Sequence, residues 1–355
     1  MKNDSKPPKI LECTLRDGSY AIDFQFTLKN TEDIAKGLDN AHFPYIEVGH
    51  GIGLGASERG ENIAAATDRE YMQAASKSVQ RGKWGMFCIP GVAKLDHLRI
   101  AADFGMDFVR IGTNITEIES SSPFIALARD LGIEVFANLM KSYALPAKEF
   151  ALAVSRSVGF GAEMVYLVDS AGGMLPTEVR SYLHALKETV PNVQIGFHGH
   201  NNLGLAVANS LVCAEEGVAM VDTSLQGFGR SAGNTPTEQF ISALIRSGYE
   251  VDIDPIEAMH VGETLIRPLI ERRGLSSLDI IAGQAQFHSS YMPSILSVAK
   301  RHRIDPRMLI IELCKRDKVN APDNLLEQLA QDLEKNAPIS TTSWGAYHGK
   351  EQDTQ

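Results

Sequence analysis

The sequence predicts an α/β fold, a (β/α)8 TIM barrel with a C-terminal α-helical appendage. Eight short apolar segments, rich in β-branched and aromatic residues, alternate with segments of helical periodicity. The short segments are apolar on both faces, which is typical of parallel strands that are covered on both sides. Eight such units in succession indicate a closed barrel. A doubly wound open sheet is the competing architecture, but it would carry a phosphate-binding fingerprint directly after the first strand, and the sequence has none there.

The expected elements follow one another in chain order. Gly132 and Gly217 come directly after two of the helical segments, which is a typical signal of a helix C-terminus. We expect the strands at Ile10–Thr14, Tyr45–Gly49, Trp84–Ile89, Phe108–Gly112, Ile133–Met140, Met164–Val168, Val193–His198 and Met220–Ser224. We expect the helices at Asn30–Asn40, Asp68–Arg81, Thr116–Leu131, Ala147–Gly159, Thr177–Val190 and Gly204–Glu216.

The domain organisation follows from the point at which the strand pattern stops. We expect a catalytic barrel at residues 9–253 and a helical C-terminal domain at residues 254–335 that packs with it as one unit, because no low-complexity linker separates them. A disordered tail at residues 1–8 and a flexible, polar tail at residues 336–355 are expected at the ends. The helices of the C-terminal domain are expected at Pro255–Glu271, Pro293–His302, Asp305–Lys315 and Asp323–Lys335.

The composition excludes several classes of protein. Lys and Arg number 34 against 44 Asp and Glu, so the net charge is −10, which argues against binding of nucleic acid or an anionic membrane. No apolar run is long enough to span a bilayer, and the polar N-terminus does not resemble a signal peptide. The 4 Cys show no metal-binding or disulfide-framework spacing. We therefore expect a cytoplasmic protein with reduced thiols.

Two histidines at the end of the seventh strand indicate a metal site. His198 and His200 are two positions apart, so on an extended strand their side chains point the same way. Active sites of such barrels lie at the carboxyl ends of the strands, where Asp17 follows the first strand. A single strand histidine is usually a core or surface residue, but two imidazoles and one carboxylate form a set that suits divalent transition metals.

Other polar and glycine-rich segments follow other strands. Gln226–Asn234 holds three glycines after the eighth strand, so it is either an anion-binding loop or a tight turn, and it lacks the Lys of a P-loop. Gly49–Gly55 superficially resembles a dinucleotide loop but is better explained as a flexible active-site loop, so no nucleotide is expected. Lys141–Tyr143 and Asp169–Gly173 add either helix caps or polar groups at the same barrel mouth.

Taken together, these motifs resemble the 4-hydroxy-2-oxovalerate aldolase family, which belongs to the superfamily of pyruvate-utilising metal-dependent barrels that includes 3-hydroxy-3-methylglutaryl-CoA lyase. The resemblance covers roughly residues 9 to 335, the appendage included. The combination of motifs is specific, whereas each motif alone would be weak. The motifs are Thr14–Ser19, Glu47–Gly51, Asp169-Ser170, His198–Asn202, Asn209-Ser210, and Gly227–Asn234 with Pro236.

The resemblance implies a reaction and roles for individual residues. Asp17, His198 and His200 would hold a divalent ion, Mn²⁺ or Mg²⁺, that binds the carboxylate and keto oxygen of a 2-oxo acid. Arg16 would stabilise the enolate that forms when the C3–C4 bond breaks, and Ser170 and His198 would contact the bound acid. A base would take the proton of the 4-hydroxyl group, so that an aldehyde leaves and the enolate becomes pyruvate.

The sequence departs from the family at the residues expected to move protons. Tyr20 stands where the family usually has the histidine base, and His288-Ser289-Ser290 stands where it usually has Tyr-Ser-Ser. Either Tyr20 or His288 is then the base, unless both are unrelated drift and the activity is changed. Tyr143 and Ile52 replace a usual His and Asp, which leaves the identity of the aldehyde open.

Three other functions remain as alternatives. A Claisen-type enzyme of the same superfamily would join an acyl-CoA to a 2-oxo acid, although Ser19 replaces its typical Glu and no basic groove for CoA is evident. A ferrous oxygenase would use the same ligand set, but usually on a jelly roll. A non-catalytic subunit is the third. In the family, the helical appendage docks an acylating aldehyde dehydrogenase, so either that partner or self-association is expected.

Overall fold

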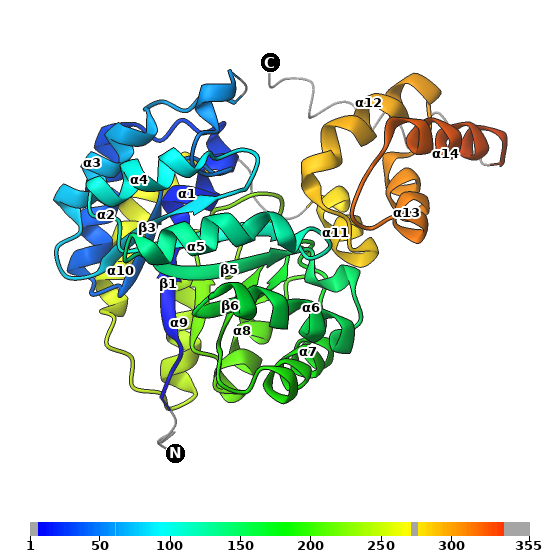
Figure 1. Ribbon diagram of the computed structural model, residues 1–355. Helices are drawn as coiled ribbons and strands as arrows, with labels where there is room; N and C mark the ends of the chain where they lie inside the picture. The colour runs from blue at the N-terminus through cyan, green and yellow to red at the C-terminus, as the bar shows by residue number, and fades with distance from the viewer. Residues whose placement is uncertain (1–5, 61, 271–275, 337–355) are drawn as a thin grey trace. The chain divides into compact units, whose positions relative to one another are not determined.

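The computed structural model describes residues 6–60, 62–270 and 276–336 (Figure 1). The chain divides into two compact units, Met1–Gly274 and Leu275–Gln355. The expected tails, 1–8 and 336–355, lie outside the described residues except for residues 6–8, which have no regular secondary structure, and Asn336, which ends the last helix. Within the described part of the chain, no helix is long and apolar enough to cross a membrane.

The first unit is a closed barrel of eight parallel strands in sequential order, which confirms the predicted fold class. The barrel closes where β1 pairs with β8, from Lys9 opposite Met220 to Glu12 opposite Thr223. All eight expected strands are present within one or two residues of their predicted ends. They are β1 (Lys9–Glu12), β2 (Tyr45–Val48), β3 (Lys83–Cys88), β4 (Phe108–Asn114), β5 (Glu134–Met140), β6 (Met164–Asp169), β7 (Gln194–Gly199) and β8 (Met220–Thr223).

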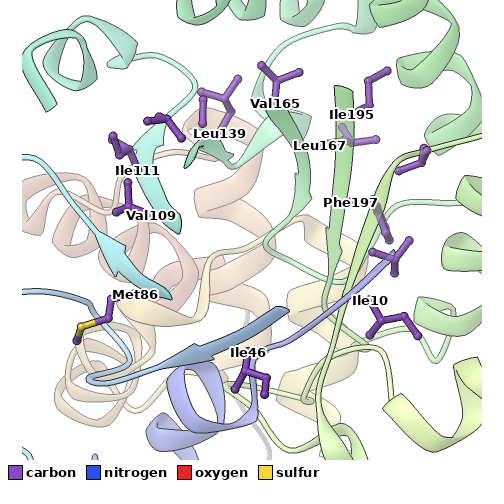
Figure 2. Close-up of a cluster of buried hydrophobic side chains, with 14 of the residues drawn as sticks. Ile10, Ile46, Met86, Val109, Ile111, Leu139, Val165, Leu167, Ile195 and Phe197 are labelled. Carbon is purple, nitrogen blue, oxygen red and sulfur yellow. The ribbon is translucent and has the colours of Figure 1, made fainter. Parts of the chain in front are cut away.

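Alternation along each strand separates the outer core from the barrel interior. Val109 and Ile111 on β4 belong to the large cluster between strands and helices, together with residues of the other strands (Figure 2). Phe108, on the opposite face of β4, belongs to a separate cluster inside the barrel with Tyr45 and Phe136. The ring centroids of Phe108 and Phe136 lie 5.5 Å apart. Both faces of the sheet are therefore apolar, which is why the strands have continuous apolar sequences.

Helices surround the barrel (Figure 1). Thr27 and Thr67 begin α2 and α3 with capping boxes, and Gly132 and Gly217 adopt positive φ just after α5 and α8, as predicted for helix C-termini. Three helices were not predicted: α1 (Thr14–Asp17), α4 (Leu95–Asp103) and α9 (Thr237–Arg246). The others are α2 (Leu28–Asn40), α3 (Asp68–Ser78), α5 (Ser122–Asp130), α6 (Ala147–Phe160), α7 (Pro176–Thr189), α8 (Ala206–Glu215) and α10 (Pro255–Val261).

The division between the two units differs from the expected boundary after residue 253. Helix α10 packs with α2 and α9, and its Ala258 and Val261 belong to the core of the barrel unit. A Cβ on Gly37 of α2 would lie 2.7 Å from Val261 Cγ2, so α10 lies directly against α2. The barrel unit extends beyond its last strand, because α10 completes the outer layer of helices.

The second unit is a small helical domain with its own apolar core. Its elements are α11 (Ser277–Ala285), a 3-10 turn at Ser289–Tyr291, α12 (Met292–His302), α13 (Pro306–Arg316) and α14 (Asp323–Asn336). Leu278, Ile295, Leu309 and Leu326 are fully buried or nearly so among these helices. The last three helices match the expected ranges, whereas α11 was not predicted.

Candidate active site with a metal-ligand cluster

The structure brings together Asp17, His198 and His200, which the sequence predicts as metal ligands. One potential ligand atom from each residue lies within 4.8 Å of those of the other two, and all three side chains are buried. His198 lies on β7 and His200 directly follows it, while Asp17 ends the short helix α1 after β1. The side chains meet because the carboxyl ends of all the strands open at the same end of the barrel.

The protonation states of this cluster are those of metal ligands. Burial favours the neutral form of Asp17, but the Arg16 guanidinium and smaller contributions from His200, His198 and Arg230 together outweigh it and hold the pKa of Asp17 well below its usual range. Burial, with the Arg230 guanidinium, lowers the pKa of His200 to about 3. At neutral pH the cluster therefore holds an ionised carboxylate and an uncharged imidazole, the forms that bind metals.

Hydrogen bonds orient the two imidazoles. His198 Nδ1 lies 2.8 Å from Asp222 Oδ2, and His200 Nδ1 lies 3.2 Å from the carbonyl oxygen of Gly233. Because carboxylate and carbonyl oxygens only accept hydrogen bonds, both Nδ1 atoms are the donors. Nε2 is then the ring atom that could bind a ligand in each histidine, and in His200 it accepts a hydrogen bond from the Arg230 guanidinium at 3.3 Å.

Asn234 also fits a divalent cation. Asn234 donates to Asp17 Oδ2 at 2.6 Å, while its own Oδ1 is buried without a hydrogen-bond partner among the described residues. An unpartnered amide oxygen beside two imidazoles and a carboxylate is a suitable donor set for a divalent ion.

Arg16, the predicted enolate-binding residue, is fixed beside this cluster. Its Nη1 donates to Asp17 Oδ1 at 2.7 Å and its Nε donates to Glu47 Oε2 at 2.7 Å. Its guanidinium lies 4.8 Å from the centre of the Phe87 ring. The Nη2 atom makes no hydrogen bond to any residue that the structure describes, so it can donate to a bound oxygen.

A buried ionic layer below the cluster was not predicted. Arg110 on β4 donates to Glu47 on β2 and to Asp222 on β8, and all three side chains are shielded from solvent. The sequence does contain a signal: Arg110 and Asp222 each interrupt an apolar strand. A charge in such a strand needs a buried partner.

Three other predicted site residues, Tyr20, Ser170 and His288, are not part of the ligand cluster. Tyr20 packs over Gly51, with the Arg230 guanidinium 5.7 Å from its ring centre. Burial raises the pKa of Tyr20, although Arg230 partly offsets this effect. Ser170 follows β6, and its hydroxyl oxygen accepts the backbone N–H of Lys141 at 3.0 Å. His288 belongs to the second unit, where its Nδ1 lies 2.6 Å from Ser290 Oγ.

Packing of the chain against itself explains the glycine at position 196, and it corrects the expectation of a flexible loop at Gly49–Gly55. The space beside Gly196 holds the protein's own Tyr166 ring, since a Cβ there would lie 2.5 Å from Tyr166 Cζ. The Gly49–Gly55 loop is well packed: His50 stacks on Phe24 at 4.2 Å and its Nε2 lies 2.6 Å from the carbonyl oxygen of Asn62. Packing of the chain against itself accounts for the small residues in both places.

Comparison with solved structures agrees with the barrel. A carboxyl transferase domain of pyruvate carboxylase from Rhizobium etli superposes with a TM-score of 0.75 at 15% identity, over 94% of this chain and 61% of that one. Hydroxymethylglutaryl-CoA lyase from Pseudomonas aeruginosa gives a TM-score of 0.65 at 18% identity, over 78% and 97% of the two chains. At these identities the likeness concerns the fold.

Comparison of sequences is more specific. The HMGL-like family model matches residues 7–265. The 4-hydroxy-2-oxovalerate aldolase of Pelotomaculum thermopropionicum is 36% identical over 92% of this chain and 96% of its own length. A second such aldolase, from Rhodococcus jostii, is 36% identical over 93% and 96%. The chain therefore belongs to the HMGL-like family and, within it, to the 4-hydroxy-2-oxovalerate aldolase family.

Proposed function

We propose that this chain is a metal-dependent carbon–carbon lyase, an aldolase that reversibly cleaves 4-hydroxy-2-oxo acids to pyruvate and an aldehyde. Its family membership supports this activity. The observation that carries the proposal is the buried cluster of Asp17, His198 and His200 directly beside the Arg16 guanidinium. A 2-oxo acid carries negative charge on its carboxylate, and its keto oxygen gains negative charge during cleavage. A divalent cation beside a fixed guanidinium suits both groups.

The pyruvate half of the substrate would be bound by the metal centre and by Arg16. Asp17, His198 and His200 would hold a divalent ion, with Mn²⁺ or Mg²⁺ as the proposed species. Such an ion supplies Lewis acidity toward the oxygens of the 2-oxo acid. Arg16 keeps Nη2 for the oxygen on which enolate charge develops, since Nε and Nη1 are held by Glu47 and Asp17.

Ser170 would bind the carboxylate of the same substrate half. Its oxygen already accepts the Lys141 N–H, so its own hydroxyl proton is directed elsewhere. Ser170 is buried at the carboxyl end of β6, next to Asp169, whose carbonyl accepts the His200 N–H at 3.2 Å. A hydroxyl donor directly after the strand that pairs with the histidine strand supports this role.

We propose that either Tyr20 or His288 takes the proton of the 4-hydroxyl group. The raised pKa of Tyr20 keeps its hydroxyl protonated at neutral pH, which makes it a weak base. An imidazole is suited to the same pH range without a large shift.

We keep two further predictions for the whole protein. The helical unit, with α12, α13 and α14 around its own core, would either dock an acylating aldehyde dehydrogenase or mediate self-association. A cytoplasmic location is consistent with the four cysteines, which are all free and buried.

The proposed function is tested by pyruvate release from racemic 4-hydroxy-2-oxopentanoate, with lactate dehydrogenase as the reporter. We expect pyruvate from Mn²⁺-loaded protein, none after chelation, and at least a hundredfold loss in His200→Ala. A parallel reaction with acetyl-CoA and a 2-oxo acid, followed by thiol release, tests the Claisen alternative. Thiol release without pyruvate formation from the hydroxy acid would overturn the aldolase assignment.

A further inference from the structure

Arg110 is a fully buried cation at the centre of the barrel interior. Its Nε donates to Glu47 Oε1 at 2.7 Å, and its Nη2 donates to the other oxygen of the same carboxylate. Its Nη1 donates to Asp222 Oδ2. The guanidinium also contacts two aromatic rings, 5.4 Å from the centre of Phe87 and 5.3 Å from the centre of Tyr166. These contacts fix both the position and the plane of the Arg110 fork.

Each carboxylate that binds Arg110 also binds a residue of the active site. Glu47 Oε2, which accepts from Arg110, accepts from Arg16 Nε at 2.7 Å as well. Asp222 Oδ2, which accepts from Arg110, lies 2.8 Å from His198 Nδ1. A single oxygen atom on each side is therefore shared between Arg110 and the site.

We propose that Arg110 is a positioning residue that orients both halves of the active site: His198 through Asp222, and Arg16 through Glu47. The roles of His198 and Arg16 in this inference rest on the proposed function. A buried guanidinium could be neutralised by one carboxylate. Here it spans β2 and β8, and each carboxylate presents one oxygen to the site.

Two aromatic rings pack closely around Arg110 in the barrel interior. A Cβ on Gly112 would lie 2.3 Å from Phe87 Cζ, and one on Gly196 would lie 2.5 Å from Tyr166 Cζ, so both rings fill the barrel interior. Without Arg110, Glu47 and Asp222 would be buried charges that draw Arg16 and His198 into new positions. The two halves of the site would then move together.

The inference predicts that Mn²⁺ affinity and pyruvate affinity respond to different carboxylate variants. Mn²⁺ affinity, measured by the free-ion electron paramagnetic resonance signal without substrate, reports His198. Pyruvate affinity, measured by calorimetry at saturating Mn²⁺, reports Arg16. Asp222→Asn should weaken Mn²⁺ binding about tenfold to a hundredfold and leave pyruvate affinity nearly unchanged. Glu47→Gln should weaken pyruvate binding about tenfold or more and leave Mn²⁺ affinity nearly unchanged.

Variants of Arg110 itself should move both affinities. Arg110→Met should weaken Mn²⁺ and pyruvate binding together, and Arg110→Lys should restore part of each, since it keeps the charge but not the fork. Asp39→Asn is the matched control. Asp39 is a buried carboxylate that accepts the N–H groups of Arg81 and Gly82 before β3, away from the carboxyl ends of the strands. It should lower the thermal midpoint while both affinities stay at the wild-type value.

Three outcomes would overturn the inference. Arg110→Met could fold and bind both ligands like the wild type, or Asp222→Asn and Glu47→Gln could each weaken both ligands in proportion to their lost stability. If Arg110→Met does not fold, the Mn²⁺ and pyruvate affinities of Arg110→Lys and of the two carboxylate variants test the inference instead. Wild-type protein with no Mn²⁺ affinity would overturn the proposed metal centre as well, which distinguishes that failure from the first two.

Discussion

Asn234 donates a hydrogen bond to Asp17 Oδ2 at 2.6 Å and thereby joins the loop after β8 to the helix after β1. With Arg16 on Oδ1, this bond leaves Asp17 with one defined orientation. We expect Asn234→Leu to weaken Mn²⁺ binding about tenfold, because a partner that orients a ligand is lost. A titration of free Mn²⁺ measures this effect. An unchanged affinity in a folded variant would show that Arg16 alone holds Asp17.

Arg16→Lys should lower kcat about a hundredfold to a thousandfold, because an ammonium cannot contact Glu47, Asp17 and the substrate in the same geometry. Steady-state cleavage at saturating Mn²⁺ measures the change. Since the metal ligands are retained, Mn²⁺ affinity should change much less than kcat. Equal losses in both would show that Arg16 chiefly supports the metal centre.

Glu12 should make the stability of the barrel depend on pH. It is fully buried between Thr14, Thr237 and the N–H of Leu225, and burial raises its pKa from 4.5 to about 7 despite these hydrogen bonds. A raised folded-state pKa means that the folded protein binds the proton more tightly than the unfolded chain. Its contribution is therefore complete below about pH 4.5 and is lost as the pH rises through 7.

The corresponding variant is Glu12→Gln. Relative to this variant, the wild-type free energy of unfolding should fall by up to about 3 kcal/mol between pH 4.5 and 8. Urea denaturation of both proteins at several pH values measures the difference. Parallel stability curves for the two proteins would contradict the raised pKa.

Tyr20→Phe and His288→Ala separate the two candidate bases. We expect His288→Ala to lower kcat by about a hundredfold or more, and Tyr20→Phe by less, because the Tyr20 hydroxyl stays protonated. Tyr20→Phe keeps the ring that packs over Gly51 and beside Arg230. Measurements of cleavage rate against pH for the three proteins test the assignment. A much larger loss in Tyr20→Phe would make Tyr20 the residue that handles the proton.

The barrel and the ligand cluster could be predicted because they depend on local pattern. The continuous apolar strands predict a parallel sheet, and two histidines on one face of a strand end need only the barrel rule to bring Asp17 beside them. Helix α1 at Thr14–Asp17 was missed because four residues are too few to show a helical period. The ionic layer was missed for a different reason. Arg110 in an apolar strand reveals that a partner is needed, but barrel closure decides that the partners are Glu47 and Asp222.

The most direct test of the central claim is the exchange of the pyruvate methyl protons with deuterium from solvent, followed by NMR. Exchange requires the enolate but no aldehyde, so it tests the site formed by Asp17, His198, His200 and Arg16 whatever the second product is. We predict exchange with Mn²⁺-loaded protein, and loss of exchange on chelation and in His200→Ala. Protein that binds Mn²⁺ but does not exchange these protons, or undiminished exchange in His200→Ala, would contradict the account.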